Sequence, residues 1–96
     1  MNTKPQKYRS QMRILVDILE AVGRDRGNAR PTHILYGANL SHDRLVKYLA
    51  RLKEKELIKE NGDGEKVTYL LTEKGIEFLR EFNKISRFAE AFGFNI

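Results

Sequence analysis

The chain of 96 residues contains no cysteine, no tryptophan and only two prolines. Without cysteine there can be no disulfide and no thiolate metal site, which excludes a disulfide-rich secreted scaffold and fits a reducing compartment. The sequence also lacks a run of about 18 apolar residues, as a membrane span requires, and its first residues lack the apolar core of a signal peptide. We therefore expect a soluble cytoplasmic protein with one small core.

Positive charge is in excess, and it is unevenly distributed along the chain. The formal net charge is +5. Residues 1–56 contain twelve Lys or Arg and six Asp or Glu, whereas residues 57–96 contain six and seven, so the two parts carry +6 and −1. Clustered basic charge indicates a polyanionic partner, because cations that neutralise phosphates release condensed counterions.

The middle of the chain predicts two helices joined by a tight turn. The first helix begins at the candidate N-cap Thr32 and ends near Ala38, where Asn39 interrupts it. Leu40 is the apolar residue expected in the turn, and the Ser41 hydroxyl can cap the second helix. Two helices joined in this way are the plan of a helix-turn-helix, whose second helix enters the DNA major groove.

The second of these helices has two different faces. Its apolar face, spaced i, i+4 and i+7, consists of Leu45, Leu49 and Leu52. Its basic face, spaced i, i+3, i+7 and i+11, consists of Arg44, Lys47, Arg51 and Lys55, with Tyr48 beside them. A basic stripe alone can also be a solvated helix face, but the turn and the cap favour a nucleic-acid surface.

The segments before this motif are an arm, a helix and a loop. Residues 1–9 predict a flexible basic arm, which is either a disordered terminus or a tail along a phosphate backbone. Ser10 can cap an amphipathic helix that ends near Gly23. Its expected core positions are Met12, Leu15, Val16, Leu19 and Val22. The polar loop that follows is either solvated or in contact with a DNA backbone through Arg24, Arg26 and Arg30.

A β-hairpin is predicted after the second helix of the motif. Segments 57–60 and 66–71 are strand candidates that flank Asn61-Gly62-Asp63-Gly64, and Asn-Gly and Asp-Gly favour hairpin turns. Three helices followed by a hairpin, the wing, are the order of a winged helix. The wing tip carries Glu60, Asp63 and Glu65, so we expect it to have a secondary role in binding phosphate.

The last predicted helix is long, with Thr72 as its N-cap, and reaches about Phe92. Gly75 in its first turn predicts close packing against another backbone. The residues expected to dock on the core are Ile76 and Leu79. A second set follows the a/d spacing of a coiled coil and consists of Phe78, Phe82, Ile85, Ala89 and Phe92. The helix could fold back over its own domain, but its length of roughly 30 Å favours pairing with a second chain.

Three blocks of the sequence resemble a known family. ILEAV, PTHILYGANLSHDRLVKYLARLKEKELI and YLLTEKGIEFLREF are similar to segments of the small archaeal winged-helix DNA-binding proteins, which are chromatin-associated or regulatory. The resemblance implies a C-terminal helix that dimerises as an antiparallel coiled coil and DNA binding with little or modest sequence preference. Carried over by motif, the DNA-binding residues are Ser41, His42, Arg44, Lys47, Tyr48 and Arg51.

The sequence therefore predicts an α+β, mainly α-helical chain in three parts. These are the arm 1–9, a winged helix-turn-helix of three helices and a two-stranded hairpin over 10–72, and a coiled-coil dimerisation helix over 73–96. The predicted function is a homodimer that docks its recognition helix in the major groove of double-stranded DNA, as a nucleoid-associated transcriptional regulator or chromatin protein. The alternative is a winged-helix adaptor that binds other proteins in a transcription-related assembly.

Catalysis, metal binding and cofactor binding are not expected. Ser41, His42 and Asp43 are the residue types of a hydrolase triad, but consecutive side chains at a helix start diverge, and a triad needs mutual hydrogen bonds. His33 and His42 lack the usual ligand spacing, and no Gly-rich phosphate loop is present.

Overall fold

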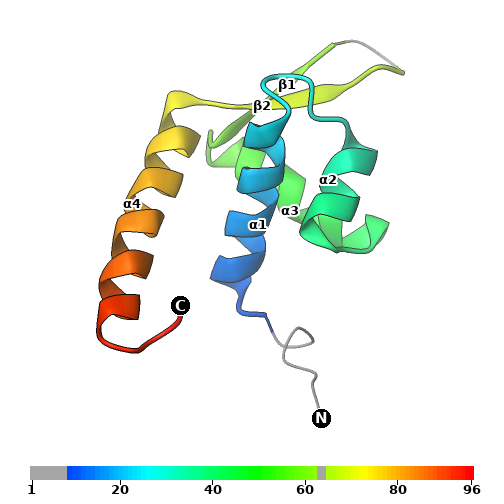
Figure 1. Ribbon diagram of the computed structural model, residues 1–96. Helices are drawn as coiled ribbons and strands as arrows, with labels where there is room; N and C mark the ends of the chain where they lie inside the picture. The colour runs from blue at the N-terminus through cyan, green and yellow to red at the C-terminus, as the bar shows by residue number, and fades with distance from the viewer. Residues whose placement is uncertain (1–8, 63–64) are drawn as a thin grey trace.

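The computed structural model describes residues 9–62 and 65–96. In this part of the chain the elements are α1 (Gln11–Arg24), α2 (Pro31–Ala38), α3 (His42–Glu54), β1 (Ile58–Asn61), β2 (Thr68–Leu71) and α4 (Glu73–Ala91). Figure 1 shows α1 in the middle of the molecule, with α4 on one side, α2 and α3 on the other, and the hairpin across the top. The predicted order of three helices, a hairpin and a long last helix is confirmed.

Helix α1 is the centre of the core. As predicted, Ser10 caps it: the Ser10 hydroxyl accepts a hydrogen bond of 3.0 Å from the Arg13 backbone N–H. Because α2, β2 and α4 all contact α1, it is enclosed on more than the single face that the pattern predicted. The prediction therefore missed Ile14 and Ile18, which are buried, and it was wrong for Met12, which is exposed. The buried residues of α1 are Ile14, Val16, Ile18, Leu19, Ala21 and Val22.

The start of α2 differs from the prediction, and its end agrees with it. Thr32 is not the N-cap; Arg30 takes this place without a side-chain hydrogen bond, and Pro31 is the first helical residue. Proline fits there because the first helical N–H has no partner inside the helix. Asn39 ends α2 in the left-handed conformation with φ of 56°, and Leu40 is buried in the turn as predicted.

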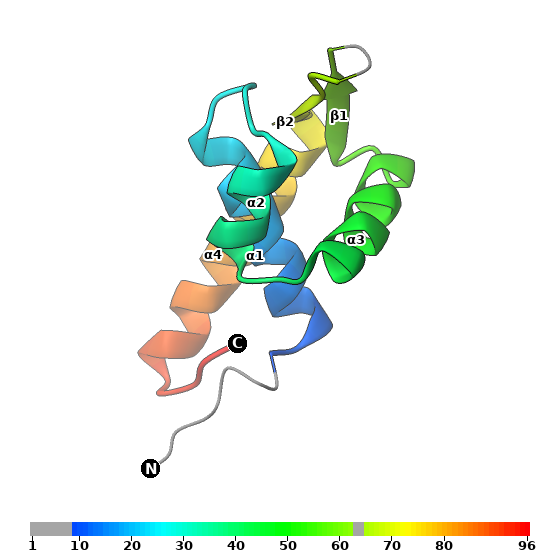
Figure 2. The same ribbon diagram turned by 90° about the vertical axis from the view of Figure 1, so that its right-hand side faces the viewer.

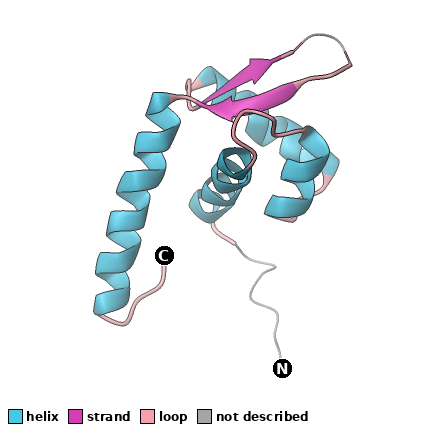
Figure 3. Cartoon of the chain, turned by 45° about the horizontal axis from the view of Figure 1, so that its top comes forward, coloured by secondary structure: helices cyan, strands magenta, loops and turns pink. Residues whose placement is uncertain are grey.

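The hairpin is short and is joined to the rest of the domain by a third segment. β1 and β2 are antiparallel, with Ile58 opposite Leu71 at one end of the ladder. On its other edge β2 pairs with the α1–α2 loop, because Ala29 and Tyr69 exchange two backbone hydrogen bonds of 3.3 and 2.8 Å. β1 is therefore the outer strand, as Figure 3 shows. Asp63 at the predicted wing tip lies outside the described residues.

Helix α4 leaves the hairpin through a close contact. Thr72 caps it as predicted, accepting a hydrogen bond of 3.0 Å from the Gly75 N–H, and the Thr72 hydroxyl donates to the Glu56 carbonyl oxygen at 2.6 Å. Gly75 is buried, and a Cβ built there would overlap the backbone carbonyl of Leu57. The predicted backbone approach at Gly75 is confirmed.

The C-terminal segment turns back toward α1. Gly93, at φ of 88°, follows the last helical residues, and its N–H donates to the Glu90 carbonyl oxygen at 2.9 Å. The Phe94 N–H donates to the Ala89 carbonyl oxygen at 2.9 Å, so the end of α4 has the hydrogen bonds of a Schellman motif. The guanidinium of Arg13 then donates to the Ile96 carbonyl oxygen at 2.6 Å, which places the end of the described chain beside α1 (Figure 1).

Candidate nucleic-acid interface

Helix α3 lies along one edge of the molecule, with its outer side open (Figure 2). As predicted, the Ser41 hydroxyl caps it, accepting a hydrogen bond of 3.4 Å from the Arg44 N–H. The core side of the helix consists of Leu45, Tyr48, Leu49 and Leu52, all buried. One side of α3 is thus held by the core, and the other faces solvent.

The basic side chains of α3 are on the solvent side. Those that the sequence placed there are all exposed: Arg44, Lys47, Arg51 and Lys55. None of the four forms an ion pair within 4.0 Å with a carboxylate of residues 9–62 or 65–96. Helical spacing also puts Asp43 and Glu54 on this half of α3, so the surface is basic but not uniformly so.

The remaining predicted contact residues divide into exposed and buried ones. Ser41 and His42 are exposed at the start of α3, and His42 Nδ1 lies 4.0 Å from the Asp43 carboxylate. Tyr48 is only 9 % exposed and belongs to the core cluster, so we leave it out of the candidate surface. Its spacing of three residues from Leu45 is the signal that could have identified this packing role.

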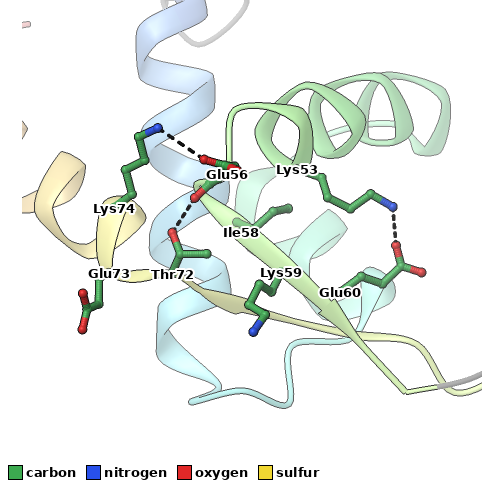
Figure 4. Close-up of a pocket in the computed structure, with 8 residues that line it drawn as sticks. All are labelled: Lys53, Glu56, Ile58, Lys59, Glu60, Thr72, Glu73 and Lys74. Carbon is green, nitrogen blue, oxygen red and sulfur yellow. Dashed lines mark hydrogen bonds and ion pairs between the residues drawn. The ribbon is translucent and has the colours of Figure 1, made fainter.

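Lys53 is a cation of α3 that the sequence analysis overlooked. Its Nζ lies 2.6 Å from Oε1 of Glu60 on β1, and Figure 4 shows the two side chains meeting across the space between helix and strand. The hydrogen bond that the Lys53 ammonium donates to Glu60, and then the charge of that carboxylate, raise the pKa of Lys53. Burial, and then the charge of Glu60, raise the pKa of the neighbouring Tyr69 hydroxyl. The wing is therefore tied to the recognition helix by a charge pair.

Arg9, which was predicted in the flexible arm, is held by the domain. Its guanidinium pairs with Asp17 at 2.7 Å and donates to the carbonyl oxygens of Ala38 and Asn39 at 2.7 and 2.9 Å. Cations satisfy the last carbonyls of a helix well, so Arg9 fastens the end of α2 to α1. The two lysines of the arm, Lys4 and Lys7, lie outside the described residues. The loop arginines Arg24, Arg26 and Arg30 are exposed.

The predicted coiled-coil stripe on α4 is partly used by its own domain. Phe78 packs against the core, as Leu79 does, because the first turns of α4 contact α1 and β2; Ile76, predicted to dock there, is 46 % exposed. Phe82 is half-buried, with the Arg13 guanidinium 5.2 Å from its ring centroid.

The second half of α4 exposes most of its apolar side chains. Ile85 is 58 % exposed and Phe92 is 67 % exposed, whereas Ala89 is half-buried. Phe88, which the 4-3 spacing left out, is also 67 % exposed, and its ring centroid lies 5.1 Å from that of Phe92. An apolar groove of about 430 Å³ continues this surface toward α1; its lining includes Met12, Leu57, Phe78, Phe82 and Ile85.

Residues 9–62 and 65–96 contain no helix that is both long and apolar enough to cross a membrane. No three His, Asp or Glu side chains of this part lie together as a metal site would require.

The chain is similar in sequence and in fold to known winged-helix proteins. The family model described as "Winged helix-turn-helix" matches residues 8–90. The crystal structure of Sso10a-2, a DNA-binding protein from Sulfolobus solfataricus, has a TM-score of 0.74 at 24% identity, covering 88% of this chain and 85% of that chain. No curated protein sequence matches.

Two longer bacterial chains share the fold. Lactococcus lactis ZitR in complex with DNA has a TM-score of 0.63 at 24% identity, covering 85% of this chain and 57% of that chain. Bordetella bronchiseptica BpsR, whose DNA binding is regulated by 6-hydroxynicotinic acid, has a TM-score of 0.63 at 23% identity, covering 81% of this chain and 56% of that chain. The chain thus spans little more than half the length of these two. The match over residues 8–90, together with three helices and a hairpin, shows that the chain belongs to the winged helix-turn-helix family.

Proposed function

We propose that this protein binds double-stranded DNA through α3 in the major groove and acts as a homodimer through α4. The observation that carries the DNA-binding proposal is the exposed set Arg44, Lys47 and Arg51 on a helix whose opposite side is fixed in the core. Arginine and lysine bind phosphate oxygens and guanine acceptors, so this surface suits both backbone and base contacts. The fold shared with a DNA-binding protein from Sulfolobus and with DNA-bound ZitR supports the proposal.

The exposed apolar part of α4 supports a second copy of the chain as the partner. The first half of the helix carries Glu73, Glu77 and Glu81 against Lys74 and Arg80, a net charge of −1, and the second half carries Lys84 and Arg87 against Glu90, a net charge of +1; all these side chains are exposed. If two α4 helices pair in antiparallel fashion, the half of each with a net charge of −1 meets the half of the other with a net charge of +1, while the phenylalanines are removed from water. The dimer would present two recognition helices to one duplex.

Two biological roles are open to such a protein, and they differ in how the protein is distributed along DNA. A nucleoid-associated chromatin protein would cover genomic fragments diffusely, whereas a transcriptional regulator would protect discrete sites. Footprinting of the purified protein on genomic fragments separates the two, and catalysis has no part in either role.

Arg44→Ala combined with Lys47→Ala should weaken DNA binding while the fold persists. We expect the dissociation constant to rise at least about tenfold at low salt, because each good contact to DNA contributes roughly 1–3 kcal/mol. Binding is measured by fluorescence anisotropy on a duplex over a salt series. The control is Lys74→Ala with Arg80→Ala, which removes the same charge from α4. An equal loss of affinity in the control would remove α3 from the interface.

Ile85→Asp should convert the dimer into monomers. Ile85 is 58 % exposed in the single chain, so the substitution leaves the core intact, but a carboxylate in an apolar seam is strongly unfavourable. Size-exclusion chromatography with light scattering gives the mass, and Asn83→Asp on the same helix is the control. A persistent dimer would place the interface elsewhere. A wild-type monomer whose DNA binding is absent or insensitive to salt would favour the adaptor function instead.

A further inference from the structure

Lys53 lies on the flank of α3 that faces the hairpin. With Val46, Ala50 and Tyr69 it lines a hollow of about 260 Å³ between the helix and β2. Its side chain remains 52 % exposed, so the ammonium group is accessible from solvent. Figure 4 shows Lys53 extending from α3 toward Glu60, while Lys59, the neighbour of Glu60 on β1, points away.

The contact between Lys53 and Glu60 is short but is not needed for the fold. The distance of 2.6 Å from Nζ to Oε1 is that of a charge-assisted hydrogen bond. Both side chains are exposed, at 52 % and 37 %, and exposed ion pairs contribute little to stability because water and salt screen them. The pair can therefore be exchanged for another anion at little cost to the domain.

The flank of a recognition helix is where the DNA backbone passes. An α-helix with its side chains is about 10–12 Å across, and the major groove is about 12 Å wide, so a docked helix fills the groove. Side chains on its flanks then meet the phosphates that border the groove, whereas those at its outermost line meet base edges. Among the described residues, Lys53 is the cation on the flank of α3 that faces the hairpin. Its ammonium group is already paired with the carboxylate of Glu60.

We propose that Lys53 is a phosphate-binding residue of the DNA interface and that Glu60 takes the place of the phosphate in the free protein. The inference rests on the proposed function and adds to it an intramolecular competitor that sets the affinity. A carboxylate and a phosphate both present anionic oxygens to the lysine ammonium, so the duplex and Glu60 compete for the same donor. This assigns the acidic wing a role: it limits the affinity of the protein for DNA.

Glu60→Gln should therefore tighten DNA binding. Glutamine keeps the length of the side chain but removes the charge, which frees Lys53 for a phosphate. We expect an affinity gain on the order of tenfold at low salt and a steeper log–log dependence on salt, by about one unit per protomer. The control is Glu56→Gln, since Glu56 is also exposed in this pocket and is paired with Lys74 at 3.7 Å (Figure 4). Thermal unfolding checks that each variant is folded.

A double variant separates release of Lys53 from a general loss of negative charge. Glu60→Gln with Lys53→Gln should bind DNA no more tightly than the wild type, because the gain requires the lysine. A gain in the double variant, or an equal gain in Glu56→Gln, would overturn the inference. Unchanged affinity in Glu60→Gln would also overturn it while leaving the proposed function intact. Absence of salt-dependent binding by the wild type would instead refute the proposed function.

Discussion

Gly75→Ala is expected to lower the free energy of unfolding by about 3 kcal/mol, although alanine is the better helix former. The new Cβ would overlap the Leu57 carbonyl oxygen and would come within 3.1 Å of the carbonyl carbon. That carbonyl cannot move away easily, because it accepts a hydrogen bond of 3.1 Å from the Thr72 N–H. Relief would require α4 to shift from the hairpin, with loss of the contacts of Phe78 and Leu79 to the core.

Gly23→Ala in α1 is the matched control for this prediction. A Cβ at Gly23 would meet only the end of the Leu71 side chain, at 3.0 Å, and a side chain can rotate where a backbone carbonyl cannot. The gain in helix propensity is about 1 kcal/mol, and it offsets the cost of moving the Leu71 side chain. We therefore expect a free energy of unfolding close to that of the wild type. Urea unfolding at a fixed protein concentration gives both values. If the two variants were equally stable, the close contact at Gly75 would be absent in solution.

Leu45→Ala is expected to destabilise the protein by about 3 kcal/mol. Leu45 is 1 % exposed and is part of the core side of α3, so its truncation leaves a cavity under the recognition helix. The loss includes both the transfer free energy of the removed carbons and the cavity that neighbouring residues cannot fill. The midpoint of urea unfolding should fall without a large change in the m value.

Val46→Ala tests whether this loss is specific to the buried side of α3. Val46 is the next residue along the helix and is 50 % exposed, so its truncation should change stability by less than about 0.5 kcal/mol. A large effect at Val46 together with a small one at Leu45 would mean that α3 is rotated about its axis. The assignment of buried and exposed side chains along α3 would then be wrong.

The elements of this fold were predictable where the signal is local. The Ser10, Ser41 and Thr72 caps each depend on a hydroxyl and an N–H three residues away, and all three are formed. The glycine contact at Gly75 was also foreseen, because a glycine in the first turn of a helix loses stability unless its lack of a side chain is needed. Thr32 failed as a cap because Pro31 suits the first helical position better.

The candidate site was predictable only in part. Exposure of Arg44, Lys47 and Arg51 followed from the spacing of the leucines on the opposite side of α3. Tyr48 was misplaced because a tyrosine at the border of the two faces can pack or project, and the amphipathic pattern alone does not distinguish these states.

By itself, the sequence determined which segments are helical or extended, where α1, α3 and α4 begin, and which side of α3 is basic, because these depend on residues within about one helical turn. Only the tertiary structure decided that Arg9 is bound to the end of α2, that Glu60 neutralises Lys53, and that Phe78 is used within its own domain. Each of these outcomes depends on how two distant segments approach each other. That approach is set by the packing of the whole core around α1, which no local spacing encodes.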